Sequence, residues 1–529
     1  MRVAFGTLVI LSTLSACRKE DGPARWDVDI AAPLFETRFI LADILPDSVQ
    51  AVDAQGGITL VYTEELFAVD LDTVFELPDT VYRYPYAFPL PGNDSFNLPA
   101  GFPVISQNNL IRFNIPDVSL IRLDARSGSL VVRMRNKIAS RVTGAFTLPG
   151  AGFADGNNTI SSSVEAGTPA DPRTSTTVKD LAGARFDLRG PALNDVNTLS
   201  TSVSAQLDPN GSGATVTNQD SVVIETFYED LVPAYVKGSF GQRSLNYAST
   251  NPLALFQNFV SGGLDLDRVR LQVRVENGIG MDLRLRLNAL QAVNTRTNVT
   301  VDMAHAILQG PINLNRALDL GNGFQTTHYV NELDNDDSNV DAFLENLPDQ
   351  LRYDLDMELN PLGDISNGND FAYHDSRLRA ELELEVPLDV IANDLVLENI
   401  VRPDLPGNED DPLMGATTVH LFAENGFPFD AQVVLDIVDI ERELLSSVPV
   451  PGRIDPGTLG TDGLVATRTA SELIAELTEE QVQLLYGPGR FRIRIIFNTP
   501  EGAGHVRLLD RYALDMRFTV EARYYVNGQ

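Results

Sequence analysis

Cysteine is almost absent from this chain. Cys17 is the one cysteine among 529 residues, so no intramolecular disulfide can form and the fold must be held by its core alone. The long apolar run near the start, Val3 to Leu14, is shorter than the roughly 20 residues that a membrane-spanning helix needs. The apolar fraction of 43% is ordinary for a globular protein, and it is enough to build a sizeable core.

Lysine is also scarce, and positive charge is far outweighed by negative charge. The chain has 40 Lys and Arg residues against 73 Asp and Glu, for a formal net charge of −33. Such a surface repels phosphate backbones, so we expect no nucleic acid partner. The lysines are Lys19, Lys137, Lys179 and Lys237.

The sequence lacks the motifs that mark common enzyme sites. It has no P-loop, no dinucleotide-binding fingerprint and no Gly-x-Ser-x-Gly nucleophile elbow. The five histidines are scattered, and none is spaced from another His or Cys as zinc ligands are. We therefore predict no catalytic residues and expect a protein that is not an enzyme. A polysaccharide-processing enzyme remains an alternative, because a pair of glycosidase carboxylates comes together only in the fold.

The amino terminus has the features of a cleaved secretion signal that ends at Cys17. Arg2 precedes the apolar run Val3 to Leu14, and Leu14-Ser15-Ala16-Cys17 follows. An aliphatic residue, two small residues and then Cys resembles the lipobox of bacterial lipoproteins. The resemblance implies that residues 1–16 are removed, that Cys17 is lipidated, and that several acyl chains anchor the protein to a membrane.

The charged tether over residues 17–25 carries a second resemblance. Lys19-Glu20-Asp21 is similar to the surface-export signal of Bacteroidota lipoproteins. Trp26 to Leu34, and phrases between Ser338 and Asp364, resemble large Bacteroidota lipoproteins without an assigned function. These resemblances imply an outer-membrane protein exposed at the cell surface, with the periplasmic face as the alternative.

Most of the mature chain has the alternating pattern of antiparallel strands. Apolar and polar residues alternate with a period of two in segments such as 269–275, 378–386 and 491–495, which predicts strands with one buried and one solvated face. The fold class expected is mainly β, with antiparallel β-sandwich-type domains and a few short helices. The Gly-, Ser- and Thr-rich segments 149–176 and 207–219 are expected to be loops.

An internal repeat supports this prediction. Asn136, Asn277 and Asn425 each follow an alternating strand and precede another, and the last two share the sequence Glu-Asn-Gly. Because Asn tolerates a left-handed backbone and Gly adopts it without cost, we expect repeated strand-Asn-(Gly)-strand hairpins or bulges. The repeat suggests three consecutive β domains over 26–235, 236–404 and 405–529, although one continuous sheet is an open alternative.

Few segments have a helical pattern. A helix is predicted over 470–486 in the third domain, with capping boxes at Thr469/Glu472 and Thr478/Gln481 that also allow two short helices with a break. A short helix is predicted over 340–347 in the second domain, and another over 251–260. The aromatic run Tyr82 to Pro89 is expected to close the end of a sandwich, with a sugar- or protein-binding edge as the alternative.

One loop has the spacing of a calcium site. Asp334, Asp336, Ser338 and Glu345 occupy positions 1, 3, 5 and 12 of an EF-hand-like loop. Asn339 stands where this motif has Gly, and no clear helix precedes the loop. The alternative is an acidic turn before a helix whose first turn holds Asp341.

These features predict a lipid-anchored surface protein that acts as a non-enzymatic binding or structural module. Its partners would be the membrane, through the anchor, and an outer-membrane protein complex to which it is an accessory. A carrier of lipid or another hydrophobic ligand is a further alternative, and it requires a continuous apolar cavity inside the strands.

Overall fold

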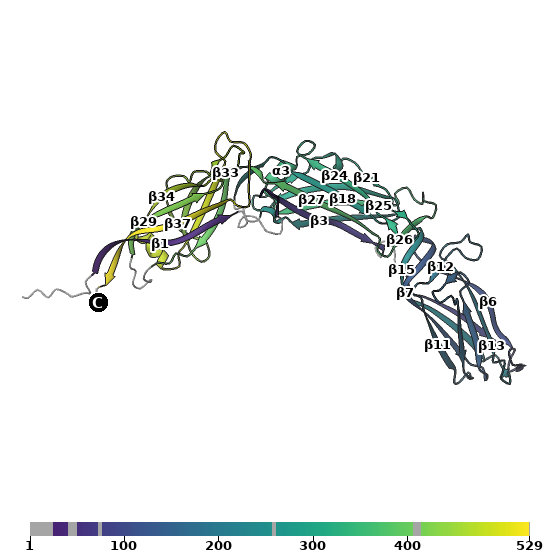
Figure 1. Cartoon of the computed structure of the whole chain (residues 1–529). Helices are drawn as coiled ribbons and strands as arrows, with labels where there is room; N and C mark the ends of the chain where they lie inside the picture. Colours follow the sequence, from purple (N-terminus) through teal and green to yellow (C-terminus); the bar gives the residue numbers. More distant parts are fainter. Residues whose placement is uncertain (1–24, 41–49, 72–76, 257–260, 406–413, 528–529) are drawn as a thin grey trace, which may run out of the picture. The chain divides into compact units, whose positions relative to one another are not determined.

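The computed structural model describes residues 25–40, 50–71, 77–256, 261–405 and 414–527, and most of them lie in antiparallel strands (Figure 1). The predicted mainly β fold is confirmed. β27 (Arg377–Pro387) illustrates why: every second residue from Leu378 to Val386 is buried, while the residues between them are partly exposed. This period of two places a continuous apolar strip on one face of each strand, and a second sheet must cover it.

The chain forms two compact units, and neither is a continuous stretch of sequence. Unit 1 contains residues 1–59, 256–267 and 388–529, and unit 2 contains residues 60–255 and 268–387. These limits differ from the predicted boundaries near 235 and 405. The physical reason is that β1 (Arg25–Ile40) pairs along its length with β37 (Ala513–Asn527), so both ends of the chain belong to one unit.

Unit 1 is a sandwich of two sheets whose inner faces meet through aromatic rings. The Phe35 ring lies 5.8 Å from Phe491 and 4.3 Å from Phe518, centroid to centroid. One sheet has the order β1-β37-β29 (Met414–Asn425)-β34 (Thr469–Leu477). The other has the order β17 (Ser261–Leu266)-β28 (Asp389–Val401)-β35 (Arg490–Asn498)-β30 (Asp430–Val438)-β31 (Leu444–Val448), with β36 (Val506–Arg507) beside β28. β2 (Gln50–Val52), β32 (Thr458–Leu459) and β33 (Val465–Thr467) also fall in this unit.

Unit 2 contains four large sheets. In the first pair, one sheet has the order β3 (Ile58–Asp70)-β27-β18 (Arg270–Asn277)-β24 (Thr327–Asp334). The other has the order β16 (Arg243–Pro252)-β25 (Gln350–Leu359)-β19 (Leu283–Asn294)-β20 (Val299–Asp302), with β21 (Ile312–Leu314) beside β19. Rings from the two sheets meet where Phe67 of β3 stacks on Tyr247 of β16. A small hairpin, β22 (Leu318–Asp319) and β23 (Phe324–Gln325), completes this part.

The second pair of sheets in unit 2 carries the surface that concerns function. One sheet joins β26 (Asp370–Tyr373), β15 (Ser221–Ser239), β7 (Ser119–Asn136), β12 (Arg185–Asp187) and β9 (Ala151–Gly152), with β11 (Arg173–Asp180) beside β7 and β4 (Thr80–Ala87) beside β15. The other has the order β10 (Thr159–Val164)-β8 (Val142–Thr147)-β13 (Thr198–Leu207)-β6 (Pro103–Arg112). β5 (Phe96–Leu98) and β14 (Ala214–Val216) form a separate short pair.

The aromatic run at 82–89 packs this second sandwich. Tyr84 and Phe88 are each 7% exposed, and the Tyr84 ring lies 6.3 Å from Phe146 of the facing sheet. Tyr84 of β4 and Phe88, just after that strand, therefore help to cover the core.

The helices are short. α3 (Val340–Glu345) agrees with the helix predicted there, whereas the helix predicted over 470–486 is wrong for its first half. Residues 469–477 form β34, and only Glu479–Tyr486 form a helix, α4, which begins at the Thr478/Gln481 capping box. Leu473, Ala475 and Leu477 alternate as buried residues, and pairing with β29 along the whole strand outweighs the helical pattern. Ala254–Phe256 and Ala306–Leu308 form single 3-10 turns.

The repeated asparagines take equivalent places in three sandwiches. Asn136 is the last residue of β7 and is fully buried. Its Oδ1 accepts the backbone N–H of Ile138 at 2.8 Å, and its Nδ2 donates to the backbone carbonyls of Ser140 at 2.8 Å and Glu165 at 2.9 Å. One side chain thus satisfies three backbone groups where the chain leaves a sheet.

The same bonds recur at the other two repeats. Asn277 accepts the N–H of Ile279 at 2.9 Å and donates to the carbonyl of Asn315 at 2.9 Å. Asn425 accepts the N–H of Phe427 at 2.9 Å. It donates to the carbonyls of Asp455 at 2.9 Å and Phe429 at 2.8 Å. In each case, the residue two positions after the asparagine accepts a further N–H from the same distant segment; the donors are Gly167, Ala317 and Gly457.

These connections are arches between sheets, and the asparagines do not act as hairpin turns. β7 and β8 lie in different sheets, as do β18 and β19, and β29 and β30. None of the three asparagines has a positive φ angle, so their side-chain hydrogen bonds, and not a left-handed backbone, explain the recurrence of Asn. The repeat is present in the structure, but its asparagines lie in arches between sheets, where hairpins or bulges were expected.

Replacing one arch asparagine should weaken its sandwich substantially. Asn425→Ala removes the Nδ2 group that donates to the buried carbonyl of Phe429 and to the partly buried carbonyl of Asp455, and a buried group left without a partner costs roughly 1–3 kcal/mol. We expect the free energy of unfolding to fall by about 3 kcal/mol, measured from urea denaturation. Asn393→Ala, at an exposed position of the same unit, is the control. Equal denaturation midpoints for the two variants would contradict the role given to the arch.

Candidate binding surface

The sheet β10-β8-β13-β6 has an outer face built almost entirely of small, uncharged polar side chains. We call it the hydroxyl face. Along β13, Leu199, Val203 and Leu207 are buried while the alternate serines reach solvent, so the strand period alone turns hydroxyls outward. The outward side chains are Thr159, Ser161 and Ser163 on β10; Thr143, Ala145 and Thr147 on β8; Ser200, Ser202, Ser204 and Gln206 on β13; and Ser106, Asn108, Leu110 and, at the strand end, Arg112 on β6.

Strand register arranges these side chains in cross-strand rows. The central row runs through Ser161, Ala145, Ser204 and Ser106, one residue from each strand. Its members are the smallest side chains of the face, and the surface is hollowed along them into an open groove that Thr143 and Gln206 also line. The larger side chains of the flanking rows therefore stand above a shallow trough.

Most hydroxyls of the face are available to a ligand. Within the described chain, Ser106, Ser161, Ser202 and Ser204 make no side-chain hydrogen bond to protein. Exceptions lie at the rim, where Thr147 and Thr159 bond each other at 2.9 Å. A serine hydroxyl can donate one hydrogen bond and accept two, so the central row offers both kinds of group.

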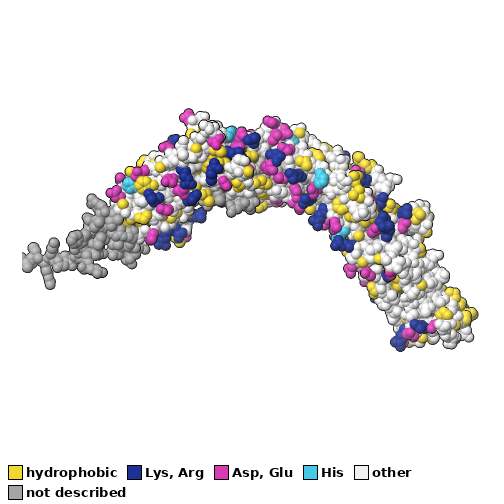
Figure 2. All heavy atoms as spheres, viewed as in Figure 1, with side chains coloured by type: hydrophobic (Ala, Val, Ile, Leu, Met, Phe, Trp, Pro, Cys, Tyr) yellow, Lys and Arg dark blue, Asp and Glu magenta, His cyan; other side chains and the backbone are white. Residues whose placement is uncertain are grey.

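The trough carries no charged side chain, although the chain as a whole is strongly acidic and Arg112 at the end of β6 is exposed on this face. Charge begins at its rim, where Arg141 donates to Ser163 at 3.0 Å and lies 3.6 Å from Glu165. By contrast, the outer face of β18 and β27 is a ladder of ion pairs, including Arg274–Glu383 at 2.8 Å. Figure 2 shows few charged side chains over the region where Figure 1 labels β6 and β13.

The sequence contained a weak signal for this face. The stretch 198–206 alternates hydroxyl residues with Leu199, Val203 and Ala205, which is a strand pattern. The segment 149–176, expected to be a loop from its Gly, Ser and Thr content, instead forms β9, β10 and the start of β11. The loop prediction was wrong because small polar residues occur both in loops and on the solvated face of a strand, so composition does not separate the two.

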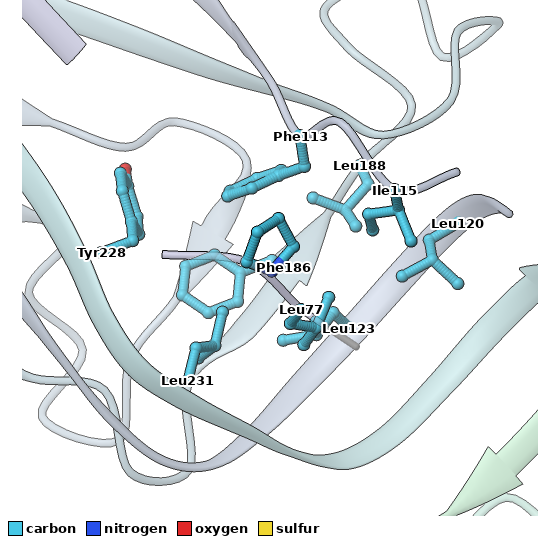
Figure 3. Close-up of a pocket in the computed structure, with 10 residues that line it drawn as sticks. Leu77, Phe113, Ile115, Leu120, Leu123, Phe186, Leu188, Tyr228 and Leu231 are labelled. Carbon is cyan, nitrogen blue, oxygen red and sulfur yellow. The ribbon is translucent and has the colours of Figure 1, made fainter. Parts of the chain in front are cut away.

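An apolar cavity lies inside the same sandwich, but it is too small for a lipid. Figure 3 shows it among Phe113, Phe186, Tyr228 and surrounding leucines. The space within is about 10 Å³, which holds at most one water molecule. Burial raises the pKa of the Tyr228 hydroxyl well above its usual value, and this hydroxyl has no hydrogen-bond partner among the described residues. The cavity therefore does not support a carrier of hydrophobic ligands.

An aromatic cluster in unit 2 is closed by its own contacts. Asp319 accepts hydrogen bonds from the hydroxyls of Tyr235 at 2.7 Å and Tyr373 at 2.9 Å, and Phe324 stacks on Tyr373 at 5.6 Å. Burial, together with the bond to Asp319, raises the pKa of Tyr373 to about 12. These contacts link the β22–β23 hairpin to β15 and β26.

The predicted calcium ligands do not form a ligand set. Asp334 ends β24 and accepts the N–H of Asp336 at 2.8 Å, the Ser338 hydroxyl donates to the Asp334 carbonyl at 2.6 Å, and Glu345 is the last residue of α3. Across the described chain, no group of three or more His, Cys, Asp or Glu side chains is placed to hold a metal ion. The calcium site stays a prediction from spacing, without support from these contacts.

The residues predicted to anchor and export the chain lie outside the described residues. This applies to the signal over 1–16, to Cys17, and to Lys19, Glu20 and Asp21. Among the helices that the structure does describe, none has the length and apolar character needed to cross a membrane.

Comparison with known proteins identifies no family. No protein-family model and no curated protein matches the chain. A Parabacteroides distasonis protein described as secreted is similar in structure over 52% of this chain and 82% of its own, at 12% identity and a TM-score of 0.29. A protein of Sulfolobus Turreted Icosahedral Virus aligns over 84% of this chain and 91% of its own, at 12% identity and a TM-score of 0.12. Scores this low do not establish a shared fold.

Proposed function

We propose that this chain is an outer-membrane lipoprotein, anchored through Cys17, which holds its β-sandwiches at the cell surface and acts there by binding. The hydroxyl face is the observation that carries the binding role. It is an exposed face whose trough has no charged side chain and offers free hydrogen-bonding groups, in a chain of net charge −33. Solvated sheet faces elsewhere in the chain carry ion pairs such as Arg274–Glu383, so this face differs from them in chemistry.

The anchor and the surface location rest on the amino terminus. The run Leu14-Ser15-Ala16-Cys17 resembles a lipobox, and Lys19-Glu20-Asp21 resembles the export signal of Bacteroidota surface lipoproteins. Two or three acyl chains make an anchor durable, where one chain would be marginal. A strand-rich body on such an anchor suits a binding or structural module, accessory to an outer-membrane complex.

Processing and surface exposure test this proposal directly. We expect globomycin to block maturation, Cys17→Ala to release the chain from the envelope, and proteinase added to intact cells to digest the wild-type chain. A periplasmic lipoprotein of known location is the control, and it should resist proteinase until the cells are broken. Retention of the Cys17→Ala chain in the envelope would reject the anchor. Resistance of the wild-type chain would reject the surface location.

The non-enzymatic role has its own test. The purified chain should leave a broad panel of glycosidic and ester substrates intact during long incubation. Hydrolysis of any of them, lost on substitution of a specific acidic residue, would favour the polysaccharide-processing enzyme instead.

A further inference from the structure

We propose that the trough of the hydroxyl face binds an uncharged glycan chain. This inference rests on the proposed function, since it names the ligand of the same face. The trough is the central row Ser161, Ala145, Ser204 and Ser106 with its flanking rows.

Charge excludes ionic ligands. The trough offers no carboxylate to a cation and no guanidinium or ammonium group to an anion, and the acidic chain repels acidic polymers at long range. The nearest basic groups are at the rim, where Arg112 lies 3.2 Å from Asp195 and Arg141 lies 3.6 Å from Glu165. A ligand matched to this surface carries no net charge and forms hydrogen bonds.

Apolar content disfavours a protein partner. Leu110, at 44% exposure, is the large apolar side chain of the face. The cores of protein interfaces are rich in aromatic and aliphatic side chains, which supply most of the binding energy. A second copy of this chain fits poorly for a further reason, because two bodies of net charge −33 repel each other.

The geometry suits a chain of sugar rings. Neighbouring strands are about 4.8 Å apart, and alternate residues of one strand are about 6.7 Å apart. Ser204 and Ser106, on neighbouring strands, therefore place two hydroxyls at a spacing comparable to one pyranose ring, while Ala145 separates them from Ser161 by one strand. Small side chains form the floor of the trough, while Thr143 and Gln206 border it. Sugar hydroxyls would donate to and accept from the serines, and each such bond contributes modestly, so affinity comes from several rings bound at once.

Affinity electrophoresis of the full mature chain, purified in detergent, tests this inference. Native gels contain either a neutral polymer (mixed-linkage β-glucan, xyloglucan, mannan or glycogen) or an acidic one (alginate or polygalacturonate). We expect at least one neutral polymer to retard the chain, acidic polymers to leave it unretarded, and high salt to have little effect because no ion pairs form. Failure of every neutral polymer to retard the chain would overturn the inference, as would retardation by acidic polymers alone.

Two variants and a matched control locate the binding. Ala145→Gln fills the floor of the trough, and Ser204→Glu places a charge in it. Each should weaken binding by about ten-fold or more while leaving the circular dichroism melting curve unchanged. Thr176→Glu adds the same charge at an exposed position of β11, on the other sheet of this sandwich, and should bind as the wild type does. Retardation that persists in both trough variants would overturn the inference.

The outcomes also separate this inference from the proposed function. If proteinase digests the chain on intact cells and Cys17 is required for retention, but no neutral polymer binds, only the ligand class is rejected. If sedimentation instead reveals self-association that Ser204→Glu abolishes, the face is a contact between copies and the glycan assignment is rejected.

Discussion

Asp436→Asn should lower the free energy of unfolding by about 3 kcal/mol. Asp436 is 1% exposed and lies on β30, where its carboxylate accepts hydrogen bonds from Arg492 at 2.9 Å and from Arg494 at 2.7 Å. Ser447 of β31 donates to the same carboxylate at 2.7 Å. The substitution keeps the shape but removes the counter-charge of Arg494 and leaves Arg492 with Glu398 alone, at 4.0 Å. We expect the lower end of the range for a broken buried pair, because Arg494 is 36% exposed and water can reach it.

The same residue gives unit 1 an acid-sensitive contribution. Burial alone would raise the pKa of Asp436, but hydrogen bonds from Ser447 and Arg492 and the charge of Arg494 lower it below its usual 3.8. A carboxyl group with a lowered folded-state pKa stabilises the fold above its unfolded pKa, and this contribution disappears as the pH falls through the folded value. The stability difference between the wild type and Asp436→Asn should therefore be full at pH 7 and shrink below about pH 4.

Urea denaturation at several pH values measures both effects. Asp375→Asn is the control, since Asp375 is 86% exposed and lies 3.7 Å from Arg126; such a surface pair contributes less than about 1 kcal/mol. A difference between the wild type and Asp436→Asn that does not change with pH would show that the loss arises from packing and not from the charge.

Gly238→Ala should prevent β15 from pairing properly with β7. A Cβ atom at Gly238 would lie 2.1 Å from the carbonyl oxygen of Ser119 and 2.7 Å from the Cα of Leu120. Both atoms belong to the backbone of β7, so no side-chain rotation relieves the clash. We expect a loss of about 3 kcal/mol or more, at or above the upper end for overpacked sites, with lower yield of folded protein.

Gly152→Ala provides the matched control for this strand position. Gly152 lies on β9 of the same sheet, and a Cβ atom there would meet nothing within 4 Å. Its melting temperature should stay close to that of the wild type. If Gly238→Ala melted at the same temperature as Gly152→Ala, the close approach of β7 and β15 would not constrain the fold.

The strands and the asparagine repeat were predictable because their causes are local or periodic. In β27, apolar residues recur at every second position because one face of the strand is buried. This pattern can be recognised without knowing which strand pairs with it. Asn136, Asn277 and Asn425 stood out by their shared flanking pattern. Their role did not, because Glu165, Asn315 and Asp455, whose carbonyls they bind, lie 29 to 38 positions further along the chain.

The segment 469–477 shows where local pattern failed. Thr469 and Glu472 have the spacing of a helix cap, but Glu472 instead lies 3.0 Å from His420 of the neighbouring strand. Pairing with β29 supplies backbone hydrogen bonds along the whole segment. A weak helical preference, worth tenths of a kcal/mol per residue, cannot compete with these bonds and with the burial of Leu473 and Leu477.

The amino-acid sequence by itself determined that this is an acidic, strand-built chain with a lipobox-like start and three repeated asparagines. Each of these features depends on residue type and spacing alone. Only the tertiary structure decided that both chain ends share one unit, that the asparagines span arches, and that side chains from four separate strands line one trough. Strand register sets those positions, and register depends on hydrogen bonds between residues distant in sequence, which no local pattern encodes.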